Sequence, residues 1–278
     1  VLDRRLPKVL GVMPTREDFT IVYSFRQKGN TLVKAHRYDA AANLVDSSLL
    51  VNLGYLFFTP RFELIRSEDR SKLLLYYVEN QDLIHAYSFD VPTQSLIWEQ
   101  KIPLKDYFYG RDFVQALVDN RGRANFIFQQ DNFRSRRKQH YYQVMSYTGS
   151  GDVGQTNIPM DDYLSYDVYF EADNLNNQIV ATGLYTEDNP ERAMGFFYVR
   201  YQPDTQEKAK VQFTPFSEEF LQNLLGRDYR EGKGLTETTV REIVLRRDGG
   251  ALLIAERNRQ LQRRTGTTSR VYYDNTIR

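Results

Sequence analysis

The sequence predicts an all-β chain built from a repeated unit of four strands. One observation is composition, because the chain has 20 Tyr and 17 Phe among 278 residues, and both types favour the half-buried surface of a pleated sheet. A second is a meander between Phe62 and Leu104, where three apolar runs are separated by short polar turns. The third is that this pattern recurs at a nearly constant interval, as in repeat architectures.

Two independent sets of anchors give the same interval. The centres of the second apolar run in each unit lie 54, 52, 54 and 73 residues apart, at Thr20, Leu74, Phe126, Val180 and Leu253. The aromatic residues that close the next run lie 51, 58, 54 and 72 residues apart, at Tyr38, Phe89, Tyr147, Tyr201 and Tyr273. Both sets lengthen at the last interval, so we expect an insertion there.

Each unit is expected to begin with a first strand followed by a tight turn. The run Leu6–Val12 supplies this strand for the first unit, and the later first strands are Phe62–Arg66, Phe113–Asp119, Tyr166–Ala172 and Val240–Arg246. The turns after them carry Glu68-Asp69, Asn120-Arg-Gly122, Asn174 to Asn177 and Asp248-Gly-Gly250. Asn, Asp and Gly supply the positive φ angles that hairpin turns require.

Four strands per unit at a spacing of about 40–50 residues is typical of propeller blades. Because one blade cannot bury both of its faces, we expect neighbouring blades to stack. We therefore predict a β-propeller with about five visible four-stranded units, the fifth lacking its outer strand, in a single domain over residues 1–278. The domain is either complete or a fragment of a larger chain. A meandering β-sandwich is the alternative, and Trp98 is expected to pack between blades.

The insertion in the last interval, over about residues 215–235, is predicted to contain a short helix followed by a polar, Gly-rich loop from Arg227 to Gly234. Ser217 suits the N-cap, two glutamates occupy the first turn, and Gly226 follows the end. Phe220, Leu221, Leu224 and Leu225 share one face, with Phe216 within reach of it. This helix either plugs the fold or serves as a lid or partner-docking element.

Charge and cysteine content exclude several function classes. The 37 basic and 36 acidic residues leave a formal charge of +1, which gives no global field for nucleic acid or an anionic membrane. Cysteine is absent, so disulfides, thiolate metal sites and cysteine nucleophiles are excluded. No apolar run has the roughly 20 residues of a membrane helix.

No motif for a cofactor or metal is found. The stretch from Gly226 to Gly234 resembles a phosphate-binding loop, but its glycine spacing is wrong and no Ser or Thr follows Lys233. His36, His85 and His140 fall in or next to the third strands of different units, and we expect them to face solvent or a neighbouring blade. We predict no catalytic, cofactor-binding or metal residues.

Carboxylates are the one catalytic alternative. Some propeller glycosidases use acids that project from inner strands as general acid, base or nucleophile. The acids on the predicted first strands are Glu63, Asp112, Asp119, Asp167, Glu171 and Glu242. A glycan-active hydrolase is therefore the second hypothesis, and an enzyme is the less favoured interpretation.

Two basic clusters occupy the same loop position in different units. Arg134, Arg136, Arg137 and Lys138 form one cluster, and Arg257 and Arg259 belong to the other. The equivalent loop is acidic in the second unit, which favours a protein partner over nucleic acid. Together with Phe220 and Leu224 of the predicted helix, these residues are the candidate partner-binding set.

The repeat resembles β-propellers across nearly the whole chain, without the signature dipeptides of a subfamily. The Tyr-rich strands, the turn from Tyr38-Asp39 to Asn43 and the lack of cysteine also resemble uncharacterised cell-envelope repeat proteins of Bacteroidota. That resemblance implies an extracytoplasmic bacterial location, in the periplasm, at the outer membrane or secreted. The predicted function is a non-catalytic binding or scaffold module for a protein or glycan partner, without a cofactor.

Overall fold

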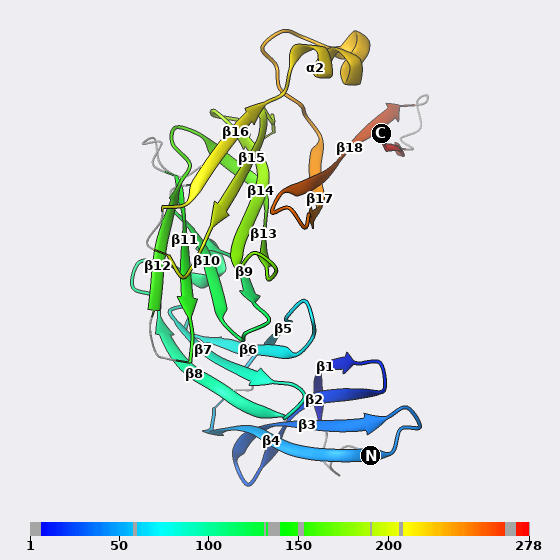
Figure 1. The fold of residues 1–278 in the computed structure, drawn as a ribbon. Helices are drawn as coiled ribbons and strands as arrows, with labels where there is room; N and C mark the ends of the chain where they lie inside the picture. Colours follow the sequence, from blue (N-terminus) through cyan, green and yellow to red (C-terminus); the bar gives the residue numbers. More distant parts are fainter. Residues whose placement is uncertain are drawn as a thin grey trace. The chain divides into compact units, whose positions relative to one another are not determined.

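The computed structural model describes residues 7–57, 60–130, 132, 140–149, 153–189, 191–205, 208–264 and 271–277. The chain divides into two compact units, residues 1–128 with 144–155 and residues 129–143 with 156–278. In the described residues, successive sheets follow one another along the chain, four with four strands and the last with three (Figure 1). The boundary between the units falls within the third sheet.

The first two sheets are antiparallel meanders in the first unit. The first contains β1 (Lys8–Pro14), β2 (Asp18–Gln27), β3 (Asn30–Asp39) and β4 (Leu44–Tyr55). The second contains β5 (Glu63–Arg66), β6 (Lys72–Glu79), β7 (Leu83–Asp90) and β8 (Ser95–Pro103). The third follows the short helix α1 (Tyr109–Asp112) and contains β9 (Phe113–Val118), β10 (Ala124–Gln130), β11 (Tyr141–Tyr147) and β12 (Val153–Pro159).

The second unit carries the last two sheets and the helical insertion. Its four-stranded sheet contains β13 (Leu164–Asp173), β14 (Gln178–Thr186), β15 (Gly195–Tyr201) and β16 (Lys210–Pro215). The insertion contains α2 (Glu218–Leu225) and a short 3₁₀ helix, η1 (Gly226–Asp228). The three-stranded sheet contains β17 (Thr238–Leu245), β18 (Ala251–Arg264) and β19 (Val271–Ile277).

The prediction of an all-β chain of propeller-type blades with a helical insertion is confirmed. Each blade is its own meander, unlike the two facing sheets of a sandwich, and the fifth lacks an outer strand in the described residues. Three of the first turns adopt positive φ at the expected residue types, Gly122 (86°), Asn177 (51°) and Gly249 (82°). In the second sheet the positive φ falls on Arg70 (62°), one residue after the predicted Glu68-Asp69. The helix α1, four residues long, was not predicted.

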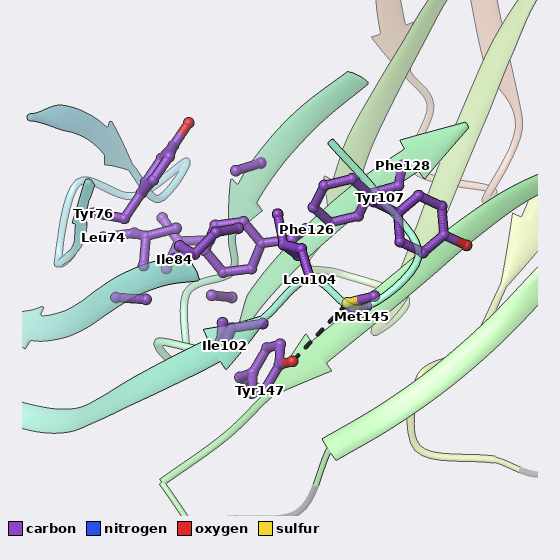
Figure 2. Close-up of a cluster of buried hydrophobic side chains, with 14 of the residues drawn as sticks. Leu74, Tyr76, Ile84, Ile102, Leu104, Tyr107, Phe126, Phe128, Met145 and Tyr147 are labelled. Carbon is purple, nitrogen blue, oxygen red and sulfur yellow. Dashed lines mark hydrogen bonds between the residues drawn. The ribbon is translucent and has the colours of Figure 1, made fainter. Parts of the chain in front are cut away.

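The largest core of the first unit joins its second and third sheets (Figure 2). Phe126 and Phe128 are fully buried in it. Trp98 packs there as predicted, and its indole N–H donates to the carbonyl of Gly122 at 2.8 Å. Burial raises the pKa of Tyr147 to about 12, so this phenol stays neutral in the physiological range.

The insertion has its own core in the second unit. Ser217 caps α2, because its side-chain oxygen accepts from the backbone N–H of Phe220 at 3.2 Å. Gly226 ends the helix at a φ of 54°. Leu221 is buried among Leu184, Leu235 and Val240, so α2 packs against β14 and β17. The predicted helix, its cap and its end are therefore confirmed.

Candidate functional site

The candidate site lies in the second unit, where the insertion returns to the sheets. Ala193 and Leu235 form an isolated β-bridge with two backbone hydrogen bonds of 2.8 Å. Gly234 permits this close approach, because a Cβ at this position would lie 2.1 Å from the carbonyl oxygen of Ala193. The bridge fixes the end of the insertion and shapes two adjoining hollows, which share Thr238 and Arg257 as lining residues.

The first hollow, the polar pocket, has a volume of about 990 Å³. Its wall is formed by β13, the loop between β14 and β15, the insertion and the adjoining parts of β17 and β18. The charged groups that line it are balanced: Asp167, Glu191, Asp228 and Glu237 are acidic, and Arg192, Arg230, Lys233 and Arg257 are basic. Such a lining suits a polar ligand or surface better than a polyanion.

Local structure positions several of these groups. Asp167 lies in a β-bulge of β13 at a φ of 49°, and its Oδ2 accepts from the backbone N–H of Val240 at 3.2 Å. Arg257 donates from Nε to the carbonyl of Thr236 at 3.2 Å and lies 3.8 Å from the Glu237 carboxylate. The buried Oδ1 of Asn258 has no hydrogen-bond partner in the described part of the chain.

The second hollow, the apolar groove, has a volume of about 800 Å³. Sheet residues from β14, β15 and β16 form one wall, including Leu184 and Phe196. Helix α2 contributes Phe220 and Leu224, and β18 contributes residues from Ala251 to Arg257. Phe220 is 44% exposed even though its ring packs 5.4 Å from that of Phe216. Exposed aromatic area beside a groove is typical of interaction surfaces.

The structure brings together three of the residues predicted to bind a partner. Phe220, Leu224 and Arg257 all line the apolar groove, although the sequence placed them in different segments. Arg259 lies further along β18, opposite Thr276 of β19. Arg134, Arg136, Arg137 and Lys138 lie outside the described residues, so the predicted joint basic patch stays a prediction.

Most of the predicted inner-strand acids have local roles. Asp112 accepts two hydrogen bonds of 2.7 Å from Arg111, and Asp119 accepts the N–H groups of Arg121 and Arg123 in its turn. Glu63 forms an exposed pair with Arg61 at 3.0 Å. Glu171 and Glu242 do not line either hollow. Of the six, Asp167 alone lines the polar pocket.

The three histidines are buried and do not face solvent, but His140 faces the neighbouring sheet, which was the other alternative expected from the sequence. His36 contacts the hydroxyl of Tyr23 at 2.9 Å, and His85 stacks on Tyr77 with ring centroids 4.4 Å apart. His140 lies 2.5 Å from the Ser165 hydroxyl, but Ser165 is fully buried, so no substrate reaches this pair. The described residues contain no group of His, Asp and Glu that could hold a metal.

The polar pocket was missed from the sequence. Its basic members Arg230 and Lys233 belong to a stretch that was interpreted only as a Gly-rich loop. The available signal was the density of charge in an inserted segment, since Arg227 to Lys233 contains five charged residues of both signs. That signal does not reveal that Asp167 and Arg257 complete the wall.

No family model and no curated protein matches the chain. Among solved structures, the β-propeller domain of the Trilobed protease from Pyrococcus furiosus is 10% identical at a TM-score of 0.42, covering 78% of this chain and 60% of that chain. The uncharacterized protein lmo1340 from Listeria monocytogenes is 10% identical at a TM-score of 0.42, and the match covers 77% of this chain and 56% of that chain. Polysaccharide lyase Uly1 is 9% identical at a TM-score of 0.44, and the match covers 98% of this chain and 70% of that chain. The chain thus spans less than two thirds of the first two, and likeness at this level assigns no activity.

Proposed function

We propose that the chain is a non-catalytic binding module that holds a protein partner on the α2 side of its second unit. The observation that carries this proposal is the apolar groove of about 800 Å³ with Phe220 44% exposed at its side. Exposed aromatic side chains beside well-formed grooves are the anchors of many protein interfaces. The balanced charges of the adjoining polar pocket provide a polar rim, which limits binding of the wrong partners.

The compartment of this binding module is also a proposal. A chain of 278 residues without cysteine suits a bacterial protein that works outside the cytoplasm. In the described residues no helix is long and apolar enough to cross a membrane. We propose an envelope location in which the chain associates with a partner assembly, because its Tyr-rich strands and lack of cysteine resemble those of cell-envelope repeat proteins.

A photo-crosslinking amino acid placed at Phe220 tests the binding function directly. We expect one protein to be captured at this position in cells that express the chain. The matched control is Leu96 of the first unit, which is 43% exposed, and it should capture nothing or a different set. Equal capture at both positions, or none at Phe220, would contradict the proposal.

A glycan-active hydrolase is the second candidate, supported by one observation. Asp167, an acid on a first strand, lines the polar pocket together with Glu237, Asp228 and Glu191. Pairs of carboxylates across a pocket perform glycoside hydrolysis as acid and base or as acid and nucleophile. One oxygen of Asp167 accepts from Val240, which would fix the orientation of the carboxylate.

Turnover decides between the two candidates. The full chain is incubated with a panel of bacterial and plant polysaccharides, and the release of reducing ends is measured. If hydrolysis occurs and Asp167→Asn lowers the rate by at least about a hundredfold, the enzyme hypothesis replaces the binding module. If no substrate is hydrolysed, the binding module stands as the better function.

A further inference from the structure

The polar pocket has a wall at β18 that is paired on both edges. The backbone N–H of Asn258 donates to the carbonyl of Glu237 at 2.9 Å, and on its other edge Asn258 pairs with Ile277 of β19. The side chain of Arg257 turns back towards β17, since its Nε donates to the carbonyl of Thr236. The whole pocket belongs to the second unit, and its 990 Å³ lies at the upper end of the roughly 300–1,000 Å³ of ligand pockets.

Two acids on different segments of this pocket have a strained backbone. Asp167, inside β13, has a φ of 49°, and Glu237, directly before β17, has a φ of 58°. The other eight non-glycine residues with positive φ in the described chain lie in turns between consecutive strands. Strained residues cluster at ligand sites, where the backbone aims a side chain. That both acids line one pocket therefore points to a ligand.

The wall offers more hydrogen-bond acceptors than its own donors satisfy. The Asp167 carboxylate accepts from the Val240 N–H through Oδ2, and its Oδ1 has no donor in the described residues. The Glu237 carboxylate lies 3.8 Å from Nη2 of Arg257, which is too long for a hydrogen bond. The Oδ1 of Asn258 is buried and also lacks a donor there. Acceptors shielded from water need new donors, so a ligand in this pocket must supply them.

The charge around the pocket favours donors that carry no charge. The four acids and four bases that line it cancel. Arg192, Arg230 and Lys233 are exposed and would repel an ammonium group. The acids would likewise repel a polyanion. Hydroxyl groups both donate to carboxylates and accept from a guanidinium without a net charge, so a polyhydroxyl ligand suits the lining.

The pair of Glu237 and Arg257 suits two neighbouring hydroxyl groups. The 3.8 Å gap leaves space for ligand oxygens to bridge the two side chains. One hydroxyl donates to the carboxylate and the next accepts from the guanidinium, which is only 13% exposed and is held by Thr236. Burial and the adjacent Asp167 raise the pKa of Tyr166, so this phenol keeps its proton and can also donate or accept.

We propose that the polar pocket binds a neutral sugar of a glycan through adjacent hydroxyl groups. The acceptors are Asp167, Glu237 and Asn258, and the principal donor is Arg257. This inference goes beyond the proposed function, because it gives the pocket a ligand of its own, apart from the partner protein at the apolar groove. It requires no bond cleavage, so it also differs from the hydrolase candidate.

A glycan array tests this inference on the full chain. The array carries neutral, acidic and amino-sugar oligosaccharides, and the strongest members are then titrated by calorimetry. We expect neutral glycans to be enriched and the best of them to bind with a Kd below about 1 mM. Enrichment of acidic or amino sugars over neutral ones, or no binding to any neutral glycan, overturns the inference.

Substitution of the two strained acids tests the site. Asp167→Asn and Glu237→Gln should each weaken the best neutral glycan at least about tenfold, because each loses a charged acceptor. Glu237 makes no side-chain hydrogen bond in the described residues, so its variant remains informative if Asp167→Asn unfolds the bulge. Asp161→Asn is the matched control, because Asp161 is an exposed acid at a φ of 51° outside the pocket. Equal binding by Glu237→Gln and the unmodified chain overturns the inference.

Crosslinking at Phe220 separates this inference from the proposed function. Glu237→Gln should lose the glycan and still allow capture of the partner protein at Phe220. Capture without any glycan binding would overturn the sugar site alone, and glycan binding without capture would overturn the proposed function alone. If Glu237→Gln abolishes capture, the pocket belongs to the protein interface and the inference is wrong.

Discussion

The strands β6 and β18 occupy the same place in their blades, yet their surroundings differ. Both contain an uninterrupted apolar run, from Leu73 to Leu75 in β6 and from Leu252 to Ile254 in β18. The β6 leucines are all at most 1% exposed, whereas Leu252 is 56% exposed and Ile254 41%. A strand with sheets on both faces reads as a continuous apolar run. The same run in β18 therefore has one face that is half-exposed in the described part of the chain.

The largest expected effect compares equivalent leucines in these strands. Leu74→Ala should cost about 2–5 kcal/mol, because it removes a fully buried side chain and leaves a cavity. Leu252→Ala should cost within about 0.5 kcal/mol, as expected for an exposed site. Denaturant titration followed by hydrogen exchange of each unit measures both costs separately. A large cost for Leu252→Ala would show that its face is already covered in the free chain.

Two glycines at positive φ extend the comparison to turns. Gly122 has a φ of 86°, and a Cβ there would lie 2.8 Å from Ile97 Cδ1 and 3.0 Å from Ser88 Oγ. Gly226 has a φ of 54° and open space around it. Gly122→Ala should therefore cost about 2 kcal/mol and Gly226→Ala about 1 kcal/mol, since only the first adds a clash to backbone strain.

Thermal melts of the two glycine variants check this order. The carbonyl of Gly122 also accepts from Trp98 and Ser88, so the fluorescence of the single tryptophan should change in Gly122→Ala alone. A cost for Gly226→Ala equal to that of Gly122→Ala would mean that backbone strain, rather than packing, dominates both turns.

Local chemistry made the strands, turns and helix predictable. Ser217 and Gly226 marked the ends of α2, because a cap oxygen satisfies the N-terminal end of a helix and glycine is common where the chain leaves a helix at positive φ. Gly122 and Gly249 marked hairpin turns for the same kind of reason. These signals depend on a few neighbouring residues, so one sequence was sufficient to place them.

The candidate site was less predictable because it depends on contacts between distant segments. Phe220 and Leu224 were singled out from helical periodicity, and they do line the groove. The approach of Leu235 to Ala193, which closes the insertion, has no local signal beyond Gly234. Burial of His140 against Ser165 was also invisible, because it depends on which strands become neighbours.

The cap of α2 provides a smaller test on the second unit. Ser217→Ala removes the oxygen that accepts from the Phe220 N–H, so α2 should lose about 1 kcal/mol of local stability. Amide exchange at Leu221 should accelerate by about fivefold, and exchange in β6 should not change. Ser217→Asp should restore protection, because its carboxylate caps the same N–H and favours the helix N-terminus.

The smallest effect concerns acid stability. Burial alone would raise the pKa of Asp90, but hydrogen bonds from Thr93 and Lys72 outweigh it and hold this pKa below 3.8. A carboxyl whose pKa is lower in the folded chain stabilises above its unfolded pKa, and this contribution disappears as pH falls through the folded pKa. Asp90→Asn should therefore remove part of the loss of stability below about pH 4.

The carboxylate of Glu256 on β18 provides a comparison with Asp90, because its pKa is also lowered by a basic partner. A hydrogen bond from Arg241 lowers the pKa of Glu256, but the Arg241 side chain is 53% exposed whereas Lys72 is 18% exposed, so salt screens the Arg241 pair more. Denaturation of both variants, Asp90→Asn and Glu256→Gln, is followed between pH 5 and 2.5, about the range in which carboxyls titrate. Only Asp90→Asn should flatten the pH profile, by well under about 1 kcal/mol. An equal change for Glu256→Gln would mean that the exposed Arg241 stabilises its carboxylate partner as strongly as the more buried Lys72 does.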